Sequence, residues 1–260
     1  MAVDWAHEFY SQTGQWWGPA EASIRERDTR RVRLLQRLCG DEPRQVLDLG
    51  SSYGSTAAAM ASAGHAVTGV EVSDRVGFAT EFTGQRFAGS LRIVHDDFYT
   101  VALGQRFDVV TYWNGFGIGT DADQRRLLRR ISGEWLAPGA TALIDVMNPL
   151  VWARWDGDTH HKQARPADGY QHAVTERLGF DPVLSRYTDT WWEAGEPGRT
   201  VSQYGRCYSP ADLRLLLEGT GLTLITLVVG DHMLDPDSPH PGHPALLHTA
   251  SEYLAVLAPG

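Results

Sequence analysis

The sequence predicts an α/β fold built on a mostly parallel sheet with helices on both faces. Short runs rich in apolar residues, such as the one over residues 46–49, alternate with segments of helical periodicity. A glycine turn joins that first run to an alanine-rich helix-forming segment over residues 55–63. The alternation continues along most of the 260 residues, a length that suits one substantial domain. Strands that alternate with helices are joined by right-handed crossovers, which make neighbouring strands parallel.

The elements can be placed in order from these patterns. An apolar stripe predicts a helix in the arginine-rich segment 20–39, after an aromatic leader. Further helices are predicted near residues 74–85, over 120–136 with Thr120 at the N-cap, and over 209–222 with Ser209 at the N-cap. Strands are predicted at the following ranges: 45–49, 65–72, 91–97, 107–113, 137–147, 222–230 and 251–259.

An insertion interrupts the alternation at Asn148-Pro149. About sixty residues rich in tryptophan, histidine, glycine and proline follow, and residues 173–209 read as two or three antiparallel strands joined by Asp-Pro and Gly-Glu-Pro-Gly turns. We therefore expect an N-terminal helical lid over residues 1–40, a core formed by 41–147 and 206–260, and a cap over 148–205.

Composition excludes several classes of partner. The formal charge of −9 and the lack of a long basic run oppose nucleic-acid binding. The N-terminus has no basic region followed by an apolar run, and no window reaches the length of a membrane span. Two cysteines, Cys39 and Cys207, fit neither a disulfide framework nor a zinc site, so we expect reduced thiols and a cytoplasmic location. Lys162 is the single lysine, a bias that suggests a GC-rich bacterial genome.

The glycine turn at residues 50–54 places backbone next to a ligand at the carboxyl end of the sheet. A dinucleotide site would need G-x-G-x-x-G spacing, whereas Gly50 and Gly54 stand four apart. The stretch from Val46 to Gly54, VLDLGSSYG, instead resembles motif I of class I S-adenosylmethionine-dependent methyltransferases, with Ser52 in place of a glycine.

Further motifs of that family follow in the same order. Glu71 ends the second predicted strand, where both classes of cofactor need a carboxylate to accept from ribose hydroxyls. VHDDF resembles the segment after the third strand, in which an acidic residue accepts from the adenine amino group and its neighbour covers the ring. FDVVTYWNGFG resembles motif IV, and LAPGATALIDV resembles the turn into the fifth strand.

The resemblance implies a Rossmann-like methyltransferase sheet with an antiparallel closing strand and an antiparallel β cap inserted after the fifth strand. It implies S-adenosylmethionine as cofactor and S-adenosylhomocysteine as product. The residues that match cofactor-binding positions are Asp48, Gly50, Ser51, Ser52, Gly54, Glu71, Val72, Asp97, Phe98 and Trp113. By similarity to small-molecule methyltransferases, the candidates for the lid and acceptor wall are Tyr10, Trp17, Asn114, Trp152, Trp155 and Tyr170.

Candidate proton acceptors are His161 and Tyr112, although spacing singles out neither of them from His160, His172 or Asp145. No metal is expected: the histidines and aspartates of residues 235–248 match no metal-ligand spacing, and their prolines indicate a stiff surface loop. Exposed strands of the insertion could pair a homodimer across a two-fold axis, or could simply cover the cleft.

The expected function is methyl transfer to a small-molecule acceptor, an aromatic or amine-bearing secondary metabolite, with carbon or nitrogen favoured over oxygen as the methylated atom. Two alternatives stay open at this point. One is an NAD(P)-dependent oxidoreductase on a similar fold, against which the glycine spacing speaks. The other is a protein that binds S-adenosylmethionine without transferring its methyl group, or a cyclase. Ser52 is the only sequence feature that favours this alternative.

Overall fold

The structure, a computed structural model, describes residues 4–260. It contains an eight-stranded sheet in the order β11-β10-β12-β5-β4-β1-β2-β3 and a separate four-stranded sheet in the order β6-β7-β8-β9. The pairs β1–β2, β1–β4 and β2–β3 are parallel, whereas β12 closes the sheet antiparallel to both β5 and β10. The fold class expected from the sequence is confirmed, including the antiparallel closing strand and the inserted antiparallel sheet.

The chain divides into two compact units. Unit 1 comprises the described part of Met1–Trp113 together with Trp135–Thr141 and Ala164–His172, and unit 2 comprises Asn114–Glu134, Ala142–Gln163 and Ala173–Gly260. The boundaries of these units follow contacts in space, and they differ from the ranges predicted for the lid, the core and the cap. The division into lid, core and cap describes roles, and it stays a prediction.

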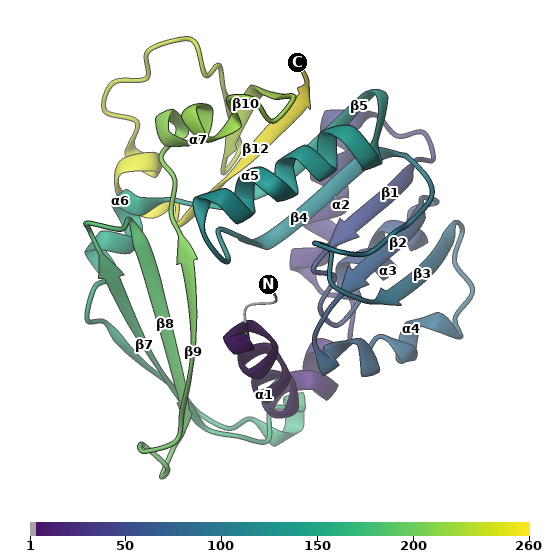
Figure 1. Ribbon diagram of the computed structural model, residues 1–260. Helices are drawn as coiled ribbons and strands as arrows, with labels where there is room; N and C mark the ends of the chain where they lie inside the picture. Colours follow the sequence, from purple (N-terminus) through teal and green to yellow (C-terminus); the bar gives the residue numbers. More distant parts are fainter. Residues whose placement is uncertain (1–3) are drawn as a thin grey trace. The chain divides into compact units, whose positions relative to one another are not determined.

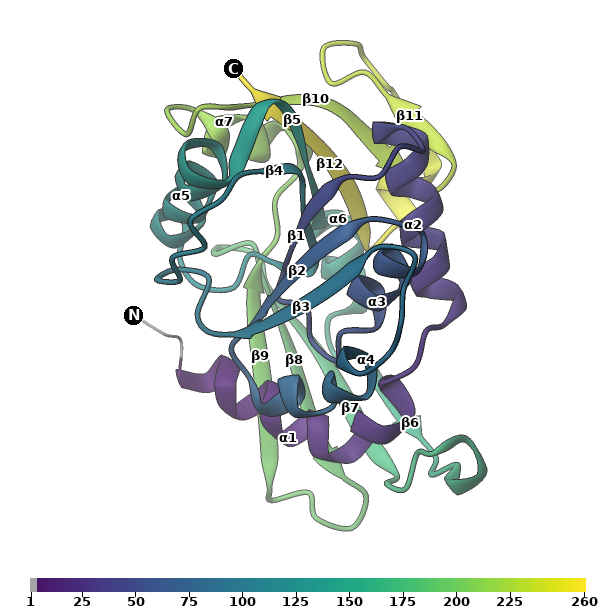
Figure 2. The same cartoon turned by 90° about the vertical axis from the view of Figure 1, so that its right-hand side faces the viewer.

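Unit 1 carries the first three strands of the large sheet, β1 (Gln45–Leu49), β2 (Ala66–Glu71) and β3 (Ser90–His95), and β4 (Phe107–Phe116) up to Trp113. Figure 2 shows β1, β2 and β3 side by side, with α3 (Ser55–Ser62) running beside them and α2 (Glu26–Cys39) packed on α3. The strands β1 and β2 are buried almost throughout, as expected for parallel strands covered by helices. Their carboxyl ends therefore share one edge of the sheet.

Other elements of unit 1 are short or N-terminal. The aromatic leader forms helix α1 (Asp4–Glu21), which contacts the 3₁₀ turn η1 (Asp74–Gly77). Where one helix is predicted near residues 74–85, the structure has η1 and the single turn α4 (Thr80–Thr83). The predicted helix over 20–39 begins only at Glu26, because Ala22 to Arg25 separate α1 from α2.

Unit 2 holds the antiparallel sheet of the insertion, which has four strands where two or three are predicted: β6 (Thr159–Lys162), β7 (Val174–Asp181), β8 (Arg186–Glu193) and β9 (Thr200–Arg206). Figure 1 shows β7, β8 and β9 side by side. Short helical turns α6 (Pro149–Trp152) and η3 (Ala153–Trp155) lead into it, and η3 contacts β7. A 3₁₀ turn, η4 (Pro166–Asp168), lies in the part of the insertion that belongs to unit 1.

The rest of unit 2 completes the large sheet. Helix α5 (Asp121–Arg130) ends in a π turn, η2 (Ile131–Trp135), before β5 (Leu136–Met147), of which residues 142–147 belong to unit 2. Helix α7 (Pro210–Leu217) packs on β10 (Leu222–Val229). Strand β12 is Glu252–Pro259, and the π turn η5 (Ala245–Thr249) precedes it. The predicted N-caps are both present: Thr120 accepts from the amide of Asp123, and Ser209 from that of Asp212. The three-residue strand β11 (His232–Leu234) is not predicted.

Candidate functional site

The turn after β1 has the left-handed backbone that its sequence demands. Gly50, Ser52 and Gly54 have φ values of 61°, 54° and 80°. A left-handed conformation suits glycine and is uncommon for other residues, so Ser52 takes the conformation of the glycine that it replaces. Glycine is also needed for space, because a Cβ on Gly54 would lie 3.0 Å from Cβ of Ala79. Serine at position 52 therefore preserves the backbone path of the turn.

Asp48, the last acidic residue before this turn, is only 1% exposed. Its Oδ1 accepts a hydrogen bond of 2.7 Å from Oγ1 of Thr111 on the neighbouring strand β4. Its Oδ2 has no hydrogen-bond partner within the part of the chain that the structure describes. Burial raises the pKa of Asp48 to about 7, an effect that the hydrogen bond from Thr111 partly offsets.

Glu71, at the carboxyl end of β2, is held by the turn itself and is 5% exposed. Its Oε1 accepts from the amide and the hydroxyl of Ser73 at 2.8 and 2.6 Å, and its Oε2 accepts from the amide of Ser52 at 2.7 Å. A carboxylate offers about four acceptor positions, so one position on Oε2 remains for a ligand hydroxyl. The carboxylate is thus fixed in orientation beside the turn, as a ribose-binding residue requires.

Arg75, a residue not singled out in the sequence, connects the turn to helix α1. Its Nη1 donates to Oγ of Ser52 at 3.1 Å, and its Nε donates to the carbonyl of Tyr10 at 2.9 Å. The guanidinium also lies 4.8 Å from the ring centroid of Tyr10 and 4.7 Å from that of Tyr53. Helix α1 is therefore tied to the glycine turn through one arginine.

The segments after β3 and within β4 meet near the same turn. The ring of Phe98 lies 5.5 Å from that of Tyr112 in an edge-to-face arrangement. A Cβ on Gly50 would lie 3.3 Å from the ring of Tyr112. Oδ1 of Asp97 accepts from the amide of Tyr99 at 2.8 Å, so this carboxylate also caps its own turn. The carbonyl of Val72 is paired with Nε2 of His95 at 3.1 Å.

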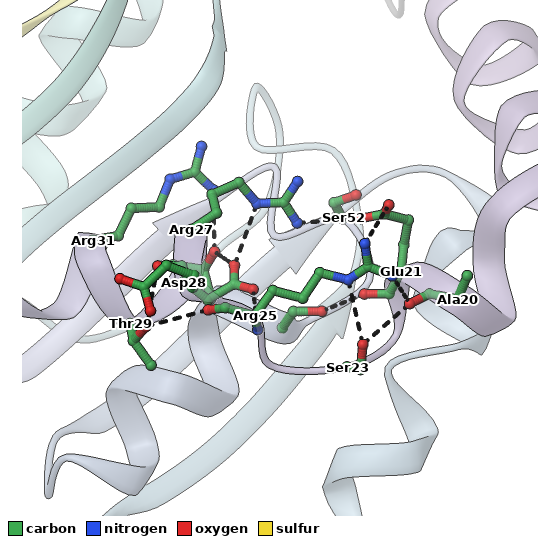
Figure 3. A network of polar contacts seen from close by, with 12 residues as sticks. Ala20, Glu21, Ser23, Arg25, Arg27, Asp28, Thr29, Arg31 and Ser52 are labelled. Atoms are coloured by element: carbon green, nitrogen blue, oxygen red, sulfur yellow. Dashed lines mark hydrogen bonds and ion pairs between the residues drawn. The ribbon is translucent and has the colours of Figure 1, made fainter. Parts of the chain in front are cut away.

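Helices α1 and α2 are joined by a network of arginines and carboxylates (Figure 3). Tyr170 also hydrogen-bonds to this network. The Tyr170 hydroxyl donates to Oε1 of Glu21 at 2.6 Å and accepts from Nη1 of Arg25 at 2.5 Å. Buried Asp28 accepts from Oγ1 of Thr56 at 2.6 Å, on the helix that follows the glycine turn. Tyr170, expected at the acceptor wall, is thus placed in unit 1 within this network, and its role toward an acceptor stays a prediction.

Orphaned polar atoms cluster at this end of unit 1, and they provide a test of whether a polar cofactor fits. Besides Oδ2 of Asp48, they include Oγ of Ser51, the hydroxyl of Tyr53 and Nε1 of Trp113. Buried polar atoms without partners are uncommon in native proteins, because each costs about 1–3 kcal/mol. Unpaired donors and acceptors beside this glycine turn match a ligand that carries hydroxyl, amino and carboxylate groups. S-adenosylmethionine carries all three.

A second feature lies wholly in unit 2, a cavity of about 620 Å³ against the insertion's sheet. This volume suits a small-molecule ligand. The cavity is lined by Asn114, Met147, Trp152, Trp155, His160, Lys162, Glu176, Leu178, Tyr187, Asp189 and Gln203. The ring of Trp152 stacks on Tyr187 at 4.5 Å and lies edge-on to Trp155 at 5.5 Å. Three of the six expected acceptor-wall residues, Asn114, Trp152 and Trp155, therefore line one cavity.

The remaining expected residues lie elsewhere. Tyr10 and Trp17 belong to helix α1 of unit 1, and Trp17 packs edge-on against Trp16 at 6.0 Å. His161 lies between His160 and Lys162 on β6, and its side chain pairs with Oγ1 of Thr175 at 3.0 Å. Because side chains alternate along a strand, His161 faces away from the cavity that His160 and Lys162 line. Its catalytic role, like that of Tyr112, stays a prediction.

The sequence reading missed several residues of the cavity, among them Asp189 and Gln203. A signal was present in the run YTDTWW, where Asp189 occupies the alternate position between Tyr187 and Trp191, two residues of core type. An acidic residue among the apolar, inward-facing positions of a strand indicates a buried carboxylate.

Residues 4–260 contain no group of three or more histidine, cysteine, aspartate or glutamate side chains able to hold a metal ion. No helix in that range is long and apolar enough to cross a bilayer.

The chain was compared with known proteins. Residues 23–227 match the family model described as "Methyltransferase domain". A curated relative, the cypemycin N-terminal methyltransferase of Streptomyces sp, is 32% identical over 154 residues, which cover 59% of this chain and 57% of the relative. The chain thus spans a little over half the length of this relative.

Solved structures agree on the fold. The CcbJ methyltransferase of Streptomyces caelestis superposes with a TM-score of 0.71 at 20% identity, covering 91% of each chain. CalS10, an amino pentose methyltransferase of Micromonospora echinaspora solved with S-adenosylmethionine bound, has a TM-score of 0.55 at 17% identity and covers 98% of this chain and 97% of its own. The CalS10 structure thus holds S-adenosylmethionine, the cofactor that the sequence predicts for this chain. From the match to more than half of its length, this chain belongs to the methyltransferase-domain family.

Proposed function

We propose that this protein transfers a methyl group from S-adenosylmethionine to an amine nitrogen of a small-molecule acceptor in the cytoplasm. The observation that carries the acceptor class is the cavity of unit 2, in which indole and phenol rings stand beside two carboxylates. Aromatic walls and negative charge together favour a ligand that is both apolar and cationic. The relatives named above, which include an N-terminal methyltransferase and an amino pentose methyltransferase, support the same acceptor class.

The residues of unit 1 supply cofactor binding in this proposal. The cofactor would supply an activated methyl group carried on a sulfonium sulfur. Glu71 would accept from its ribose hydroxyls through the remaining position on Oε2, and the left-handed turn would let backbone approach it. Asp97 and Phe98 would contact the adenine, with the ring of Phe98 held by Tyr112. The orphaned polar atoms of Asp48, Ser51 and Trp113 would gain partners.

A primary or secondary aliphatic amine is protonated at neutral pH and has no free electron pair, so the protein must bind the cation and take its proton. A carboxylate in a cavity can do both. An oxygen acceptor would instead need a group able to remove a proton from a hydroxyl. Among the residues that line the cavity, His160 is the only imidazole, and it is exposed. The chemistry of the lining therefore favours nitrogen over oxygen.

The proposal can be tested with S-adenosylmethionine labelled with ¹³C in its methyl group. The purified protein is incubated with a panel of aromatic and amino-sugar amines and with the matched alcohols, and the products are followed by ¹H–¹³C correlation spectra. We expect a new N-methyl signal that depends on both protein and amine. Transfer only to oxygen or carbon would refute the nitrogen assignment, and binding of S-adenosylmethionine without transfer to any acceptor would favour a non-transferring binder.

A further inference from the structure

Asp189 is a buried carboxylate in the middle of the cavity's sheet face. Side chains of Tyr187, Asp189 and Trp191 alternate onto the buried face of β8, and Asp189 is 5% exposed. Its direct neighbours across the sheet are Leu178 on β7 and Gln203 on β9, both of which also line the cavity. The carboxylate thus occupies a central row of a surface on which apolar and aromatic side chains alternate with polar ones.

The carboxylate is oriented but only half satisfied. Its Oδ2 accepts from Nε2 of Gln203 at 2.7 Å. Its Oδ1 is buried without a hydrogen-bond partner among the residues that the structure covers. Burial raises the pKa of Asp189, and the side chains of Trp191 and Gln203 only partly offset this effect. Burying a charge without a partner is unfavourable, and a cation placed against Oδ1 would offset that cost.

The other charged groups at the cavity do not neutralise Asp189. Lys162 of β6 pairs with Oε2 of Glu176 at 3.3 Å, and its ammonium lies 4.0 Å above the ring of Trp191. Glu176 of β7 raises the pKa of Asp189 further by repulsion, whereas Lys162 lowers it. His160 of β6 is exposed, and β9 contributes only the neutral Gln203. Lys162 is already committed to Glu176, so the lining has one carboxylate in excess.

We propose that the unit 2 cavity binds the ammonium group of its ligand through Oδ1 of Asp189, with Gln203 holding the carboxylate in place and Trp152, Trp155 and Tyr187 contacting the ligand's apolar body. This inference rests on the proposed function, since the ligand would be the amine acceptor. An ammonium N–H supplies the hydrogen bond that Oδ1 lacks, and its charge balances the excess carboxylate. The same oxygen can then take one proton from the nitrogen, which leaves a neutral amine and a neutral carboxylic acid without any change in electron count.

A pair of isosteric probes tests this assignment. The probes are 5-fluorotryptamine, which carries an ammonium, and 5-fluorotryptophol, which carries a hydroxyl in its place. Binding of each to the full chain is titrated by ¹⁹F NMR at pH 7.5, without cofactor and without turnover. We expect the ammonium probe to bind at least about tenfold tighter than the hydroxyl probe, because only the former compensates the buried charge.

Two variants assign the preference to one residue. Asp189→Asn keeps the size and the hydrogen bond with Gln203 but removes the charge, and it should reduce the preference to less than about twofold. Asp158→Asn removes the same charge from an exposed position just before β6 and should retain the full preference. Thermal melting of both variants checks that they fold. If Asp189→Asn folds and keeps the preference, or if the wild-type chain shows no preference or binds neither probe at millimolar concentration, the inference is wrong.

The pH dependence gives a second readout, and a separate assay distinguishes the two proposals. Affinity for the ammonium probe should fall as the pH drops below about 6, where Asp189 is protonated, and Asp189→Asn should remove this dependence. If the labelled-methyl assay yields an N-methyl product and Asp189→Asn leaves its KM unchanged, the proposed function stands and this inference fails. If the ammonium preference depends on Asp189 but no amine is methylated, the binding inference stands and the proposed function fails.

Discussion

At the scale of single residues, the turn after β1 combines backbone strain with unsatisfied polar atoms. Ser52 holds a left-handed conformation, and Asp48 and Ser51 bury oxygens that have no hydrogen-bond partner in the described structure. Each feature lowers the stability of the ligand-free protein, and such costs persist where a site is prepared for a ligand. Because these residues belong to one short motif, most of this site could be read from the sequence.

Gly54 offers a direct test of the turn's geometry. Gly54→Ala places a side chain at a φ of 80° and 3.0 Å from Cβ of Ala79. We expect it to lower the free energy of unfolding by about 1–2 kcal/mol and to weaken S-adenosylhomocysteine binding. Gly77→Ala is the matched control, because a Cβ there meets no atom within 4 Å and φ is not left-handed. Urea unfolding measures the free energy of unfolding of both variants. Equal stability of the two would contradict the requirement for glycine at position 54.

Asp48 should make the ligand-free protein less stable at higher pH. Its pKa is raised in the folded state from 3.8 to about 7, so the folded protein binds the proton more tightly than the unfolded chain does. The corresponding stability is complete below about pH 4 and is lost as the pH rises through about 7, by about 4 kcal/mol at most. Asp48→Asn lacks this loss and keeps an acceptor for Thr111.

Urea unfolding at pH 5 and pH 8 measures this effect. The stability of Asp48→Asn relative to the wild-type protein should be greater at pH 8 than at pH 5. Thr111→Val, which removes the one hydrogen-bond donor to this carboxylate among residues 4–260, should increase the wild-type pH dependence. Parallel pH dependences for Asp48→Asn and the wild-type protein would show that Asp48 is charged at no cost in the folded state.

At the scale of elements, local signals predicted what local residues determine. Thr120 and Ser209 cap α5 and α7 as their sequences indicate, since a cap needs only residues three apart. The region of residues 74–85 breaks into η1 and α4 because its apolar side chains are few and Gly77 and Gly84 interrupt it. Strand β6 was missed because all four of its side chains are exposed, which leaves no apolar alternation to detect.

The cap of α5 gives the prediction at this scale. Oγ1 of Thr120 accepts from the amide of Asp123 at 3.2 Å, and Oδ2 of Asp123 accepts from the amide of Thr120 at 3.0 Å. Thr120→Ala should lower the free energy of unfolding by about 1 kcal/mol, whereas Thr120→Ser should keep the cap and most of the stability. Urea unfolding of the three proteins checks this. A loss in Thr120→Ser as large as that in Thr120→Ala would assign the effect to the threonine methyl group instead.

At the scale of the whole molecule, the two units differ in how far sequence predicted their sites. The residues proposed to bind the cofactor in unit 1 follow the ends of parallel strands, whose order in the sheet is implied by the alternation of strands and helices. The cavity of unit 2 depends on the register of β6, β7, β8 and β9, which brings Leu178, Asp189 and Gln203 into one row. That register depends on turn lengths and pairing between distant residues, which a single sequence does not specify.

Cofactor binding in unit 1 should stabilise the protein against heat. A ligand at 100 times its Kd adds about 2.7 kcal/mol, so S-adenosylhomocysteine at that concentration should raise the Tm by about 5–10 °C, and NAD(H) should raise it by none. Glu71→Ala removes the carboxylate that accepts from the amides of Ser52 and Ser73, and should abolish this shift relative to its own ligand-free Tm. Glu81→Ala, at an exposed position of α4, should keep the shift. Differential scanning fluorimetry measures the Tm of the wild-type protein with each of the two ligands, and of each variant with S-adenosylhomocysteine. Each value is compared with the Tm of the same protein without ligand. A shift with NAD(H) but not with S-adenosylhomocysteine would reinstate the oxidoreductase alternative, because the folded state gains stability only from a ligand that it binds.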